Sequence, residues 1–210
     1  VDEWVQIEGL SNLMGYGSLH KRLYINGELL TKAVIDKSTE INREAFHNCT
    51  SLTSVTIGNG VTSIGSCAFN GCSSLASVFI GDSVTSIGEN AFKDCTSLTS
   101  ITIGKSVTSI AGDAFEGCTS LQFNRYDNGL YLGNETNKYL VLIKPKTQGL
   151  KNITINAECK TIVDGAFRSC SSLKTINYKG SKEQWDAISK GSNWNSDTGS
   201  YTINYNYVEN

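Results

Sequence analysis

The segment Leu52-Thr-Ser-Val55-Thr-Ile57 decides the fold, because it returns 23 residues later as Leu75-Ala-Ser-Val78-Phe-Ile80 and again as Leu98-Thr-Ser-Ile101-Thr-Ile103. Each copy continues through Val-Thr-Ser-Ile to an Ala-Phe pair and a Cys. A fixed period of this length is typical of a solenoid, in which each unit buries its apolar face only by stacking on its neighbours. The repeat over residues 52–121 therefore predicts the architecture of the chain.

Within one unit the apolar positions follow neither a helical period nor a steady alternation, so the chain must turn corners. Val55 to Ile57 alternates as a half-buried strand does, Gly58 to Gly60 supplies turn residues, and Val61 to Ile64 indicates a second short strand. Cys67 to Cys72 is long enough for about one helical turn. We expect an α/β fold: a strand-dominated solenoid with parallel β-sheets and short helical turns.

Equivalent residues of stacked coils should form columns, because neighbouring strands lie about 4.8 Å apart. One column holds seven leucines: Leu30, Leu52, Leu75, Leu98, Leu121, Leu150 and Leu173. A second holds Phe46, Phe69, Phe92, Phe115 and Phe167. Burying one such side chain contributes roughly 1.5–3 kcal/mol, which offsets the loss of chain entropy only if neighbouring coils cover both faces.

Cysteines form a third column. Its members are Cys49, Cys72, Cys95, Cys118 and Cys170, whereas Cys67 and Cys159 lie outside it. The chain lacks the CxxC pairs of structural zinc sites, and columnar stacking does not favour a disulfide framework across coils. We expect buried free thiols that act as small apolar residues, with an occasional disulfide as the alternative.

The pattern LxxLxIxxxVxxIxxxAFxxCxSL, which covers about Leu30 to Tyr178, resembles the BspA-like (Treponema-type) class of leucine-rich repeat. The resemblance implies a right-handed superhelix with a parallel sheet on its concave face. It also implies a bacterial parent protein that is secreted or held at the cell surface, with adhesion to host proteins or to other cells as its role. Two departures are that the loop after each first strand lacks the family's frequent Pro and that the array is interrupted.

Three regions follow from the sequence. Residues 1–22 are expected to be an N-terminal cap or partial unit, in which Trp4-Val-Gln-Ile7 has helical spacing and the chain begins inside a unit. Residues 23–178 hold about seven leucine-rich-repeat coils, preceded by a hairpin signal at Asn26-Gly27. Residues 179–210 are expected to be a C-terminal helix-strand cap.

The array is interrupted between Leu121 and Leu150, where the spacing is 29 residues instead of 23. Within this insertion, about residues 122–149, two apolar segments at 129–132 and 139–143 flank a polar loop and predict a hairpin. The C-terminal cap carries a helix signal from Ser181 to Gly191 and an alternating strand signal from Tyr201 to Tyr207.

Composition excludes several classes of function. With 18% charged residues and a net charge of −2, the chain does not suggest nucleic-acid binding, and no apolar run is long enough to span a membrane. Neither His20 nor His47 belongs to a nucleophile motif, and Glu44, Asp94 and Glu116 fit solvated repeat turns. We therefore expect no enzyme activity, no cofactor, no metal and a monomer.

The candidate binding residues are departures from a plain Thr and Ser surface. Phe79 occupies the column in which Thr56 and Thr102 stand, and an outward aromatic beside basic residues can anchor a protein partner. The later coils add Phe123, Arg125, Lys151 and Lys174. We expect a contact surface from Phe79 toward Arg125 and the hairpin at 129–143; the alternative is that Phe79 packs on its neighbours.

The leading function is a non-enzymatic interaction or adhesion module of a cell-surface protein. Its partner would be a host extracellular-matrix or cell-surface protein, or another bacterial surface protein. The second interpretation is a structural spacer within a longer repeat protein. A third, carbohydrate binding, is weaker because the three Trp residues lie in the end segments.

Overall fold

The computed structural model describes residues 5–6, 24–25 and 28–208, and the chain forms two compact units, residues 1–122 and 123–210. Each unit is described by itself. The described residues form short strands joined by turns, with a single five-residue helix. The fold is a strand-dominated parallel β-solenoid, as the sequence predicts.

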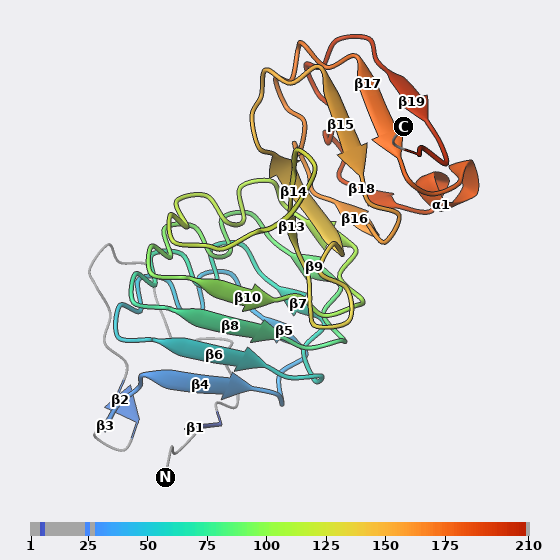
Figure 1. Cartoon of the computed structure of the whole chain (residues 1–210). Coiled ribbons are helices and arrows are strands. Elements are labelled where there is room, and N and C mark those ends of the chain that lie inside the picture. The colour runs from blue at the N-terminus through green and yellow to red at the C-terminus, as the bar shows by residue number, and fades with distance from the viewer. Residues whose placement is uncertain (1–4, 7–23, 26–27, 209–210) are drawn as a thin grey trace. The chain divides into compact units, whose positions relative to one another are not determined.

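Each regular coil of the first unit contributes one strand to each of two parallel sheets (Figure 1). The first sheet, in the order β1-β4-β6-β8-β10, consists of Val5–Gln6, Lys32–Ile35, Ser54–Ile57, Ser77–Ile80 and Ser100–Thr102. The second, in the order β11-β9-β7-β5, consists of Ser109–Ile110, Ser86–Ile87, Ser63–Ile64 and Glu40–Ile41. The register follows the 23-residue period, since Val55 pairs with Val78 and Val78 with Ile101.

The core is built from the columns that the period predicts. Val55 and Ile57 are buried and Thr56 between them is half-buried, as the alternation of a strand requires. All seven leucines of the predicted column are buried. Because every coil supplies the same apolar positions, the core continues from one coil to the next.

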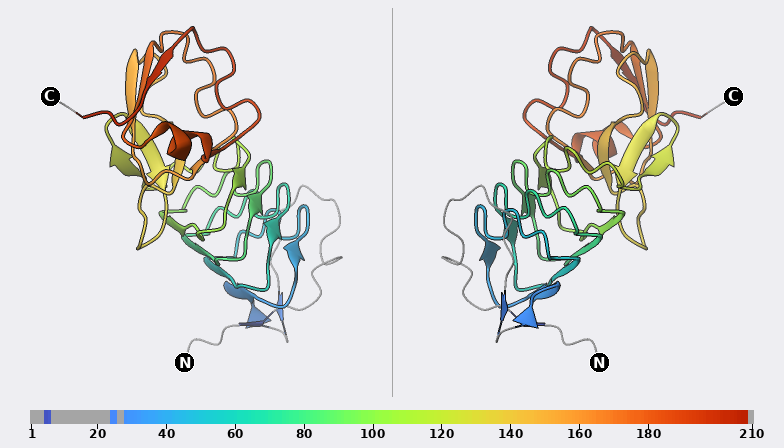
Figure 2. Two further views of the ribbon diagram at one scale, coloured as in Figure 1. Left: turned by 90° about the vertical axis from the view of Figure 1, so that its right-hand side faces the viewer. Right: turned by 90° about the vertical axis from the view of Figure 1, so that its left-hand side faces the viewer.

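The segment after each second strand, expected to form about one helical turn, is a ribbon of turns instead. In residues 65–72, alternate amides, those of Cys67, Phe69 and Gly71, donate to carbonyls of the next coil at 2.8 Å. The amides between them donate to the carbonyl three residues earlier. Cys67 and Gly71 in this ribbon have left-handed φ angles, of 57° and 72°. Figure 2 shows the coils of the first unit as a stack of similar loops.

The phenylalanine column is a stack of nearly parallel rings. Ring centroids are 5.0 Å apart for Phe46 and Phe69, 5.2 Å for Phe69 and Phe92, and 5.7 Å for Phe92 and Phe115. In the second unit Phe167 meets Trp194 edge to face, with centroids 5.8 Å apart. The first four members therefore confirm the predicted column as a continuous aromatic stack.

All seven cysteines are free thiols, and only Cys67 is not buried. Three thiols of the column donate to the phenylalanine carbonyl of the preceding coil: Cys72 to Phe46, Cys95 to Phe69 and Cys118 to Phe92. The column cysteines thus fill core space as small residues and also cross-link coils through weak hydrogen bonds.

The predicted N-terminal hairpin is present as β2 (Tyr24–Ile25) and β3 (Glu28–Leu29), which pair antiparallel. Its Asn26-Gly27 turn lies outside the described residues. Of the expected cap over residues 1–22, the structure describes only β1, which pairs parallel with β4. The expected helical segment from Trp4 to Ile7 is therefore wrong at Val5 and Gln6, which form a strand, while Trp4 and Ile7 lie outside the described residues.

The insertion forms the predicted hairpin from β13 (Gly129–Leu132) and β14 (Val141–Pro145), and an unpredicted strand, β12 (Asn124–Tyr126), extends it. In the loop between β13 and β14, the Asn134 side chain accepts hydrogen bonds from the Thr136 amide and hydroxyl at 3.1 and 2.8 Å. β14 also pairs parallel with β16 (Thr161–Ile162). The insertion is therefore part of a five-stranded sheet with the order β12-β13-β14-β16-β18, in which β18 is Ser189–Lys190.

The other sheet of the second unit is parallel and consists of β15 (Asn152–Ile155), β17 (Thr175–Tyr178) and β19 (Thr202–Asn204). β19 confirms the strand expected from the alternation after Tyr201, and it pairs with the last predicted repeat strand. Between β17 and β19 the chain forms α1 (Lys182–Asp186) and β18 (Ser189–Lys190), which pairs with β16.

The C-terminal segment repeats the hydrogen bonds of a coil. The amide of Phe167 donates to the carbonyl of Trp194 at 2.7 Å, as that of Phe46 does to Ala68. α1 has the predicted capping box of Ser181 and Gln184 but ends at Asp186, before Gly191. Gly191 serves another purpose, because a Cβ there would overlap the backbone of Asp164 in the preceding coil.

Removing one ring from the stack should destabilise the first unit. We expect Phe69→Ala to lower the free energy of unfolding by about 3–5 kcal/mol, because the fully buried ring leaves a cavity between two neighbours. Urea unfolding followed by far-ultraviolet circular dichroism measures the change. Phe79→Ala removes the same ring from an exposed position and should cost well under half as much; equal losses would contradict the stack as a source of stability.

Stability should fall at alkaline pH because of the buried thiols. Burial raises the pKa of Cys72 and of Cys95, and raises that of Cys118 to about 11 and that of Cys159 to about 12. Since the thiols of the unfolded chain ionise near pH 8.5, the unfolded state loses these protons first. Above that pH, each buried thiol lowers the free energy of unfolding by about 1.4 kcal/mol per pH unit.

The urea midpoint at about pH 7, 8.5 and 10 tests this effect. In Cys95→Ala the free energy of unfolding should fall less steeply above pH 8.5, by about the contribution of one proton to the slope. The variant removes one titrating group and leaves the Tyr and Lys residues unchanged. An identical slope in the variant and the native chain would show that Cys95 is not protected from ionisation.

Candidate interaction surface

Phe79 projects from the first sheet of the first unit, on the strand next to the edge strand β10. It lies on β8, where the register places Thr56 on one side and Thr102 on the other. Val78 and Ile80 on either side of it are buried, whereas 49% of Phe79 is exposed. In the described part of the chain, it is the one aromatic among the exposed large hydrophobic residues, which are Leu29, Phe79 and Val208.

The surface around Phe79 is made of small hydroxyl side chains that bond between coils. Ser77 donates to Ser54 at 3.2 Å, and Thr99 donates to the carbonyl of Ala76 at 3.1 Å. Thr53 makes the equivalent bond to the carbonyl of Thr31 at 2.8 Å. The ring therefore stands on a sheet whose polar groups already hold neighbouring coils together.

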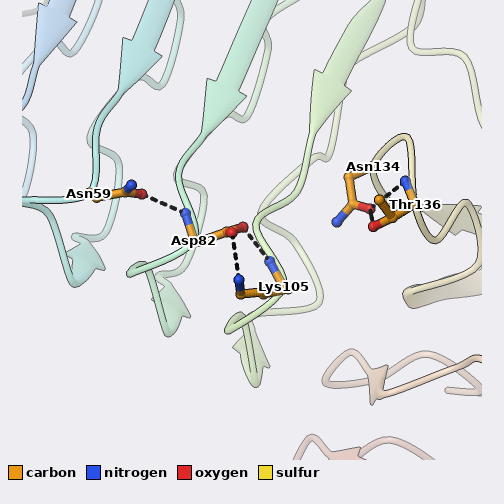
Figure 3. Close-up of polar contacts among 5 residues, drawn as sticks. All are labelled: Asn59, Asp82, Lys105, Asn134 and Thr136. Atoms are coloured by element: carbon orange, nitrogen blue, oxygen red, sulfur yellow. Dashed lines mark hydrogen bonds and ion pairs between the residues drawn. The ribbon is translucent and has the colours of Figure 1, made fainter.

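A polar ladder borders the sheet at the corner after each strand (Figure 3). The Asn59 side chain accepts from the Asp82 amide at 2.9 Å, and the Asp82 carboxylate accepts from the Lys105 amide at 3.1 Å. The Lys105 ammonium lies 3.0 Å from the same carboxylate. These two contacts lower the pKa of Asp82, the amide more than the ammonium. The ladder fixes the corner beside Phe79, although an exposed ion pair adds little stability.

The other four predicted site residues belong to the second unit. Phe123 is half-buried immediately before β12, and Arg125 is exposed on that strand. Lys151 and Lys174 are exposed and lie in one column, because the Lys174 amide donates to the Lys151 carbonyl at 2.7 Å. The structure thus brings together Phe123 with Arg125 and Lys151 with Lys174. A single surface from Phe79 to Arg125 would span both units and stays a prediction.

Two basic residues beside Arg125 were not predicted. Arg125 is in register with Leu130, and Leu130 with Lys144, so Arg125 and Lys144 project from the same face of the β12-β13-β14 strands. Lys146, two residues further on, is also exposed. The sequence shows the two lysines as Lys144-Pro-Lys146. Only the strand β12, which the sequence did not predict, places Arg125 on the same face as Lys144.

The described residues contain no group of three or more His, Cys, Asp or Glu that could hold a metal ion. Among them, no helix has the length and apolar character needed to cross a membrane. Trp185 is buried, with Tyr178 at 5.4 Å and Trp194 at 5.9 Å between ring centroids. Its ring is core and does not form an open sugar-stacking platform.

The parallel coils and the repeat define a leucine-rich-repeat solenoid. The pattern of the BspA type leucine rich repeat region matches residues 18–139 and 146–206 in six copies. The chain belongs to this family. No curated protein sequence matches it.

Several solved structures are similar to this chain. A T. pallidum leucine rich repeat protein is 26% identical with a TM-score of 0.45, and the match covers 70% of this chain and 58% of that one. A leucine-rich repeat protein from Bacteroides ovatus is 23% identical with a TM-score of 0.44, covering 87% and 54%. A leucine rich cell surface protein from Faecalibacterium prausnitzii is 22% identical with a TM-score of 0.31, covering 77% and 65%. This chain spans less than two thirds of the length of each.

The corner beneath the polar ladder should not accept a side chain. A Cβ at Gly104 would overlap the carbonyl oxygen of Gly81 in the preceding coil. We expect Gly104→Ala to lower the free energy of unfolding by about 1–3 kcal/mol, measured by urea unfolding. Gly149→Ala is the matched control, because nothing lies within 4 Å of a Cβ there; a tolerated Gly104→Ala would argue against the close approach of coils.

Proposed function

We propose that this chain is a non-enzymatic protein-interaction module of a secreted or cell-surface protein, and that it binds a protein partner through the sheet face around Phe79. The observation that carries the proposal is the half-exposed ring of Phe79 on a strand that is paired in register on both sides in a parallel sheet. Family membership supports the module and the surface context. The partner would be a host extracellular-matrix or cell-surface protein, or another bacterial surface protein.

The physical argument rests on preorganisation. An aromatic side chain that a partner can bury fully supplies a large apolar area at a small cost in side-chain entropy. Phe79 is held by a strand with a hydrogen-bonded strand on each side, so binding need not order the backbone. The Ser and Thr neighbours are short, which lets a partner reach the ring from above.

The second unit offers a separate group of candidate binding residues. Arg125, Lys151 and Lys174 are exposed, and Phe123 adds a half-buried aromatic next to Arg125. Arg is enriched at interface hot spots, because its guanidinium forms several hydrogen bonds and packs on aromatic rings. We propose that these residues make contacts of their own with a protein partner.

The alternative function is a structural spacer. It is supported by the hydroxyl-to-carbonyl bonds between coils, such as Thr85 to Thr62 at 3.1 Å, which engage the Thr side chains within the array. In that case Phe79 is a tolerated exposure and the chain binds nothing. Carbohydrate binding has less support, because Trp185 is buried.

Binding of the isolated 210-residue chain to a panel of extracellular-matrix proteins and bacterial surface proteins, measured by surface plasmon resonance, tests the proposal. We expect saturable binding to at least one member of the panel. Phe79→Ala should lower the affinity by about tenfold or more, since an aromatic hot-spot residue contributes about 2 kcal/mol or more to the free energy of binding. Arg125→Ala should weaken the same complex by a smaller factor.

Thr102→Ala, in the strand next to Phe79, is the matched control and should leave the affinity nearly unchanged. Binding that survives the double change Phe79→Ala and Arg125→Ala would remove this face from the proposal. No binding to any panel member would favour the spacer.

A further inference from the structure

The two units carry opposite net charges. Residues 1–122 hold seven Lys and Arg against twelve Asp and Glu, a net charge of −5, and residues 123–210 hold eleven against eight, a net charge of +3. The overall charge of −2 conceals this division. Part of the excess in each unit lies in one group of neighbouring side chains.

Part of the acidic excess of the first unit lies along its turn ribbon. We name Glu89, Asp94, Asp113 and Glu116 the acidic ridge. Glu89, Asp94 and Glu116 are exposed and Asp113 is half-buried. Adjacent coils hold these residues together, because the Asp94 amide donates to the Glu116 carbonyl at 2.8 Å and the Asn90 amide donates to the Asp113 carboxylate at 3.3 Å.

The ridge is only partly neutralised. Lys93 forms a 2.7 Å ion pair with Glu116, and within the described residues no ion pair involves Glu89, Asp94 or Asp113. In the described part of the chain, Glu89 and Asp94 are therefore the ridge carboxylates with neither an ion-pair partner nor a hydrogen-bond donor, while Asp113 accepts from the Asn90 amide.

Part of the basic excess of the second unit lies on the insertion. We name Arg125, Lys144 and Lys146 the basic hairpin face, which also includes Leu130 between Arg125 and Lys144. All three cations are exposed, and none forms an ion pair with another described residue. The nearest acid along β12, Asp127, is engaged elsewhere, because its carboxylate accepts from the Thr154 amide at 2.7 Å.

We propose that the basic hairpin face of one copy binds the acidic ridge of a second copy, so that copies of this chain associate head to tail. This contact joins two different patches, so a copy that uses one patch keeps the other available, and the association is heterologous and can continue to further copies. It departs from the monomer expected from the sequence and does not depend on the proposed site at Phe79.

A second copy is the partner that the observations favour, because the chain itself supplies the complementary surface. Three exposed cations on the insertion would meet an edge on which four acids lie in two adjacent coils. Contacts between exposed charges are weak and screened beyond about 8 Å at physiological salt, so the association should be salt-sensitive.

Sedimentation velocity of the full chain over a range of concentrations tests the proposal. We expect association at about 50 mM NaCl that weakens by about tenfold or more at about 500 mM NaCl, because added salt shortens the screening length. A chain that remains monomeric at low salt and high concentration would overturn the proposal, as would association that is insensitive to salt.

Charge reversal identifies the two faces. The variant Lys144→Glu with Lys146→Glu should be monomeric, and so should Glu89→Lys with Asp94→Lys, because each copy then carries two patches of like charge. An equimolar mixture of the two variants should associate again, since each reversed patch then meets a patch of opposite charge on the other variant. Failure of the mixture to associate would overturn the pairing.

The matched control is Lys160→Glu with Arg168→Glu, which makes the same change of net charge at two exposed residues of the second unit that do not belong to the basic hairpin face. It should associate like the native chain. Circular dichroism and thermal unfolding establish that each variant is folded. If the control loses association equally, net charge alone drives self-contact and the two faces are refuted. If the native chain is monomeric but binds heparin, the basic hairpin face serves an anionic glycan instead.

Discussion

In-register hydrogen bonding between parallel coils is the constraint on which the rest of the structure depends. In the first unit this pairing is found in the two parallel sheets and in the turn ribbon, where the Phe69 amide donates to the Ala91 carbonyl of the next coil at 2.8 Å as a strand amide would. Such a ladder persists only if each coil presents its amides at the same points, which requires coils of equal length. The 23-residue period is therefore a consequence of backbone pairing, and the side-chain columns follow from it.

The same ladder restricts the size of side chains at the corners. The Asn48 side chain lies over Gly71, and the Asp94 side chain lies over Gly117, so that a Cβ at either glycine would overlap the oxygen above it. Both glycines also have positive φ angles, of 72° and 74°. A longer side chain in one coil thus requires glycine in the next, a dependence that one repeat alone would not reveal.

Much of the fold could be predicted because periodicity reports columns directly. The sequence placed Val55, Phe69 and Cys72 in the core, and it located both hairpins from their turn residues. It missed the turn ribbon, since local spacing fits a helical turn and cannot show that Cys67 bonds to the next coil. The sequence did not predict β12, because Asn124-Arg-Tyr126 is too polar to indicate a strand. This segment is a strand because it pairs with β13.

The C-terminal coil was missed for a related reason. Trp194 takes the hydrogen-bonding position that Ala68 holds in a regular coil, and a helix precedes it. The backbone therefore repeats the coil, although the amino-acid sequence of this segment does not repeat the pattern. For the candidate site, the column of Thr56 and Thr102 predicted the exposure of Phe79. Its grouping with Arg125 could not be derived, because columns relate residues only within one uninterrupted stack.

These constraints determine where individual function can reside in such a chain. Inward-facing side chains form the core, and the corners hold glycines and polar ladders. Many outward-facing Thr hydroxyls form hydrogen bonds between coils. What remains are exposed departures from the repeat: Phe79 in place of Thr, the insertion with Arg125 and Lys144, and the acids on the turn ribbon. Because the ladder tolerates changes only where no neighbouring coil is touched, such departures concentrate on surfaces that a partner can reach. A partner would therefore recognise what differs between coils, while the parts that are the same hold those differences in place.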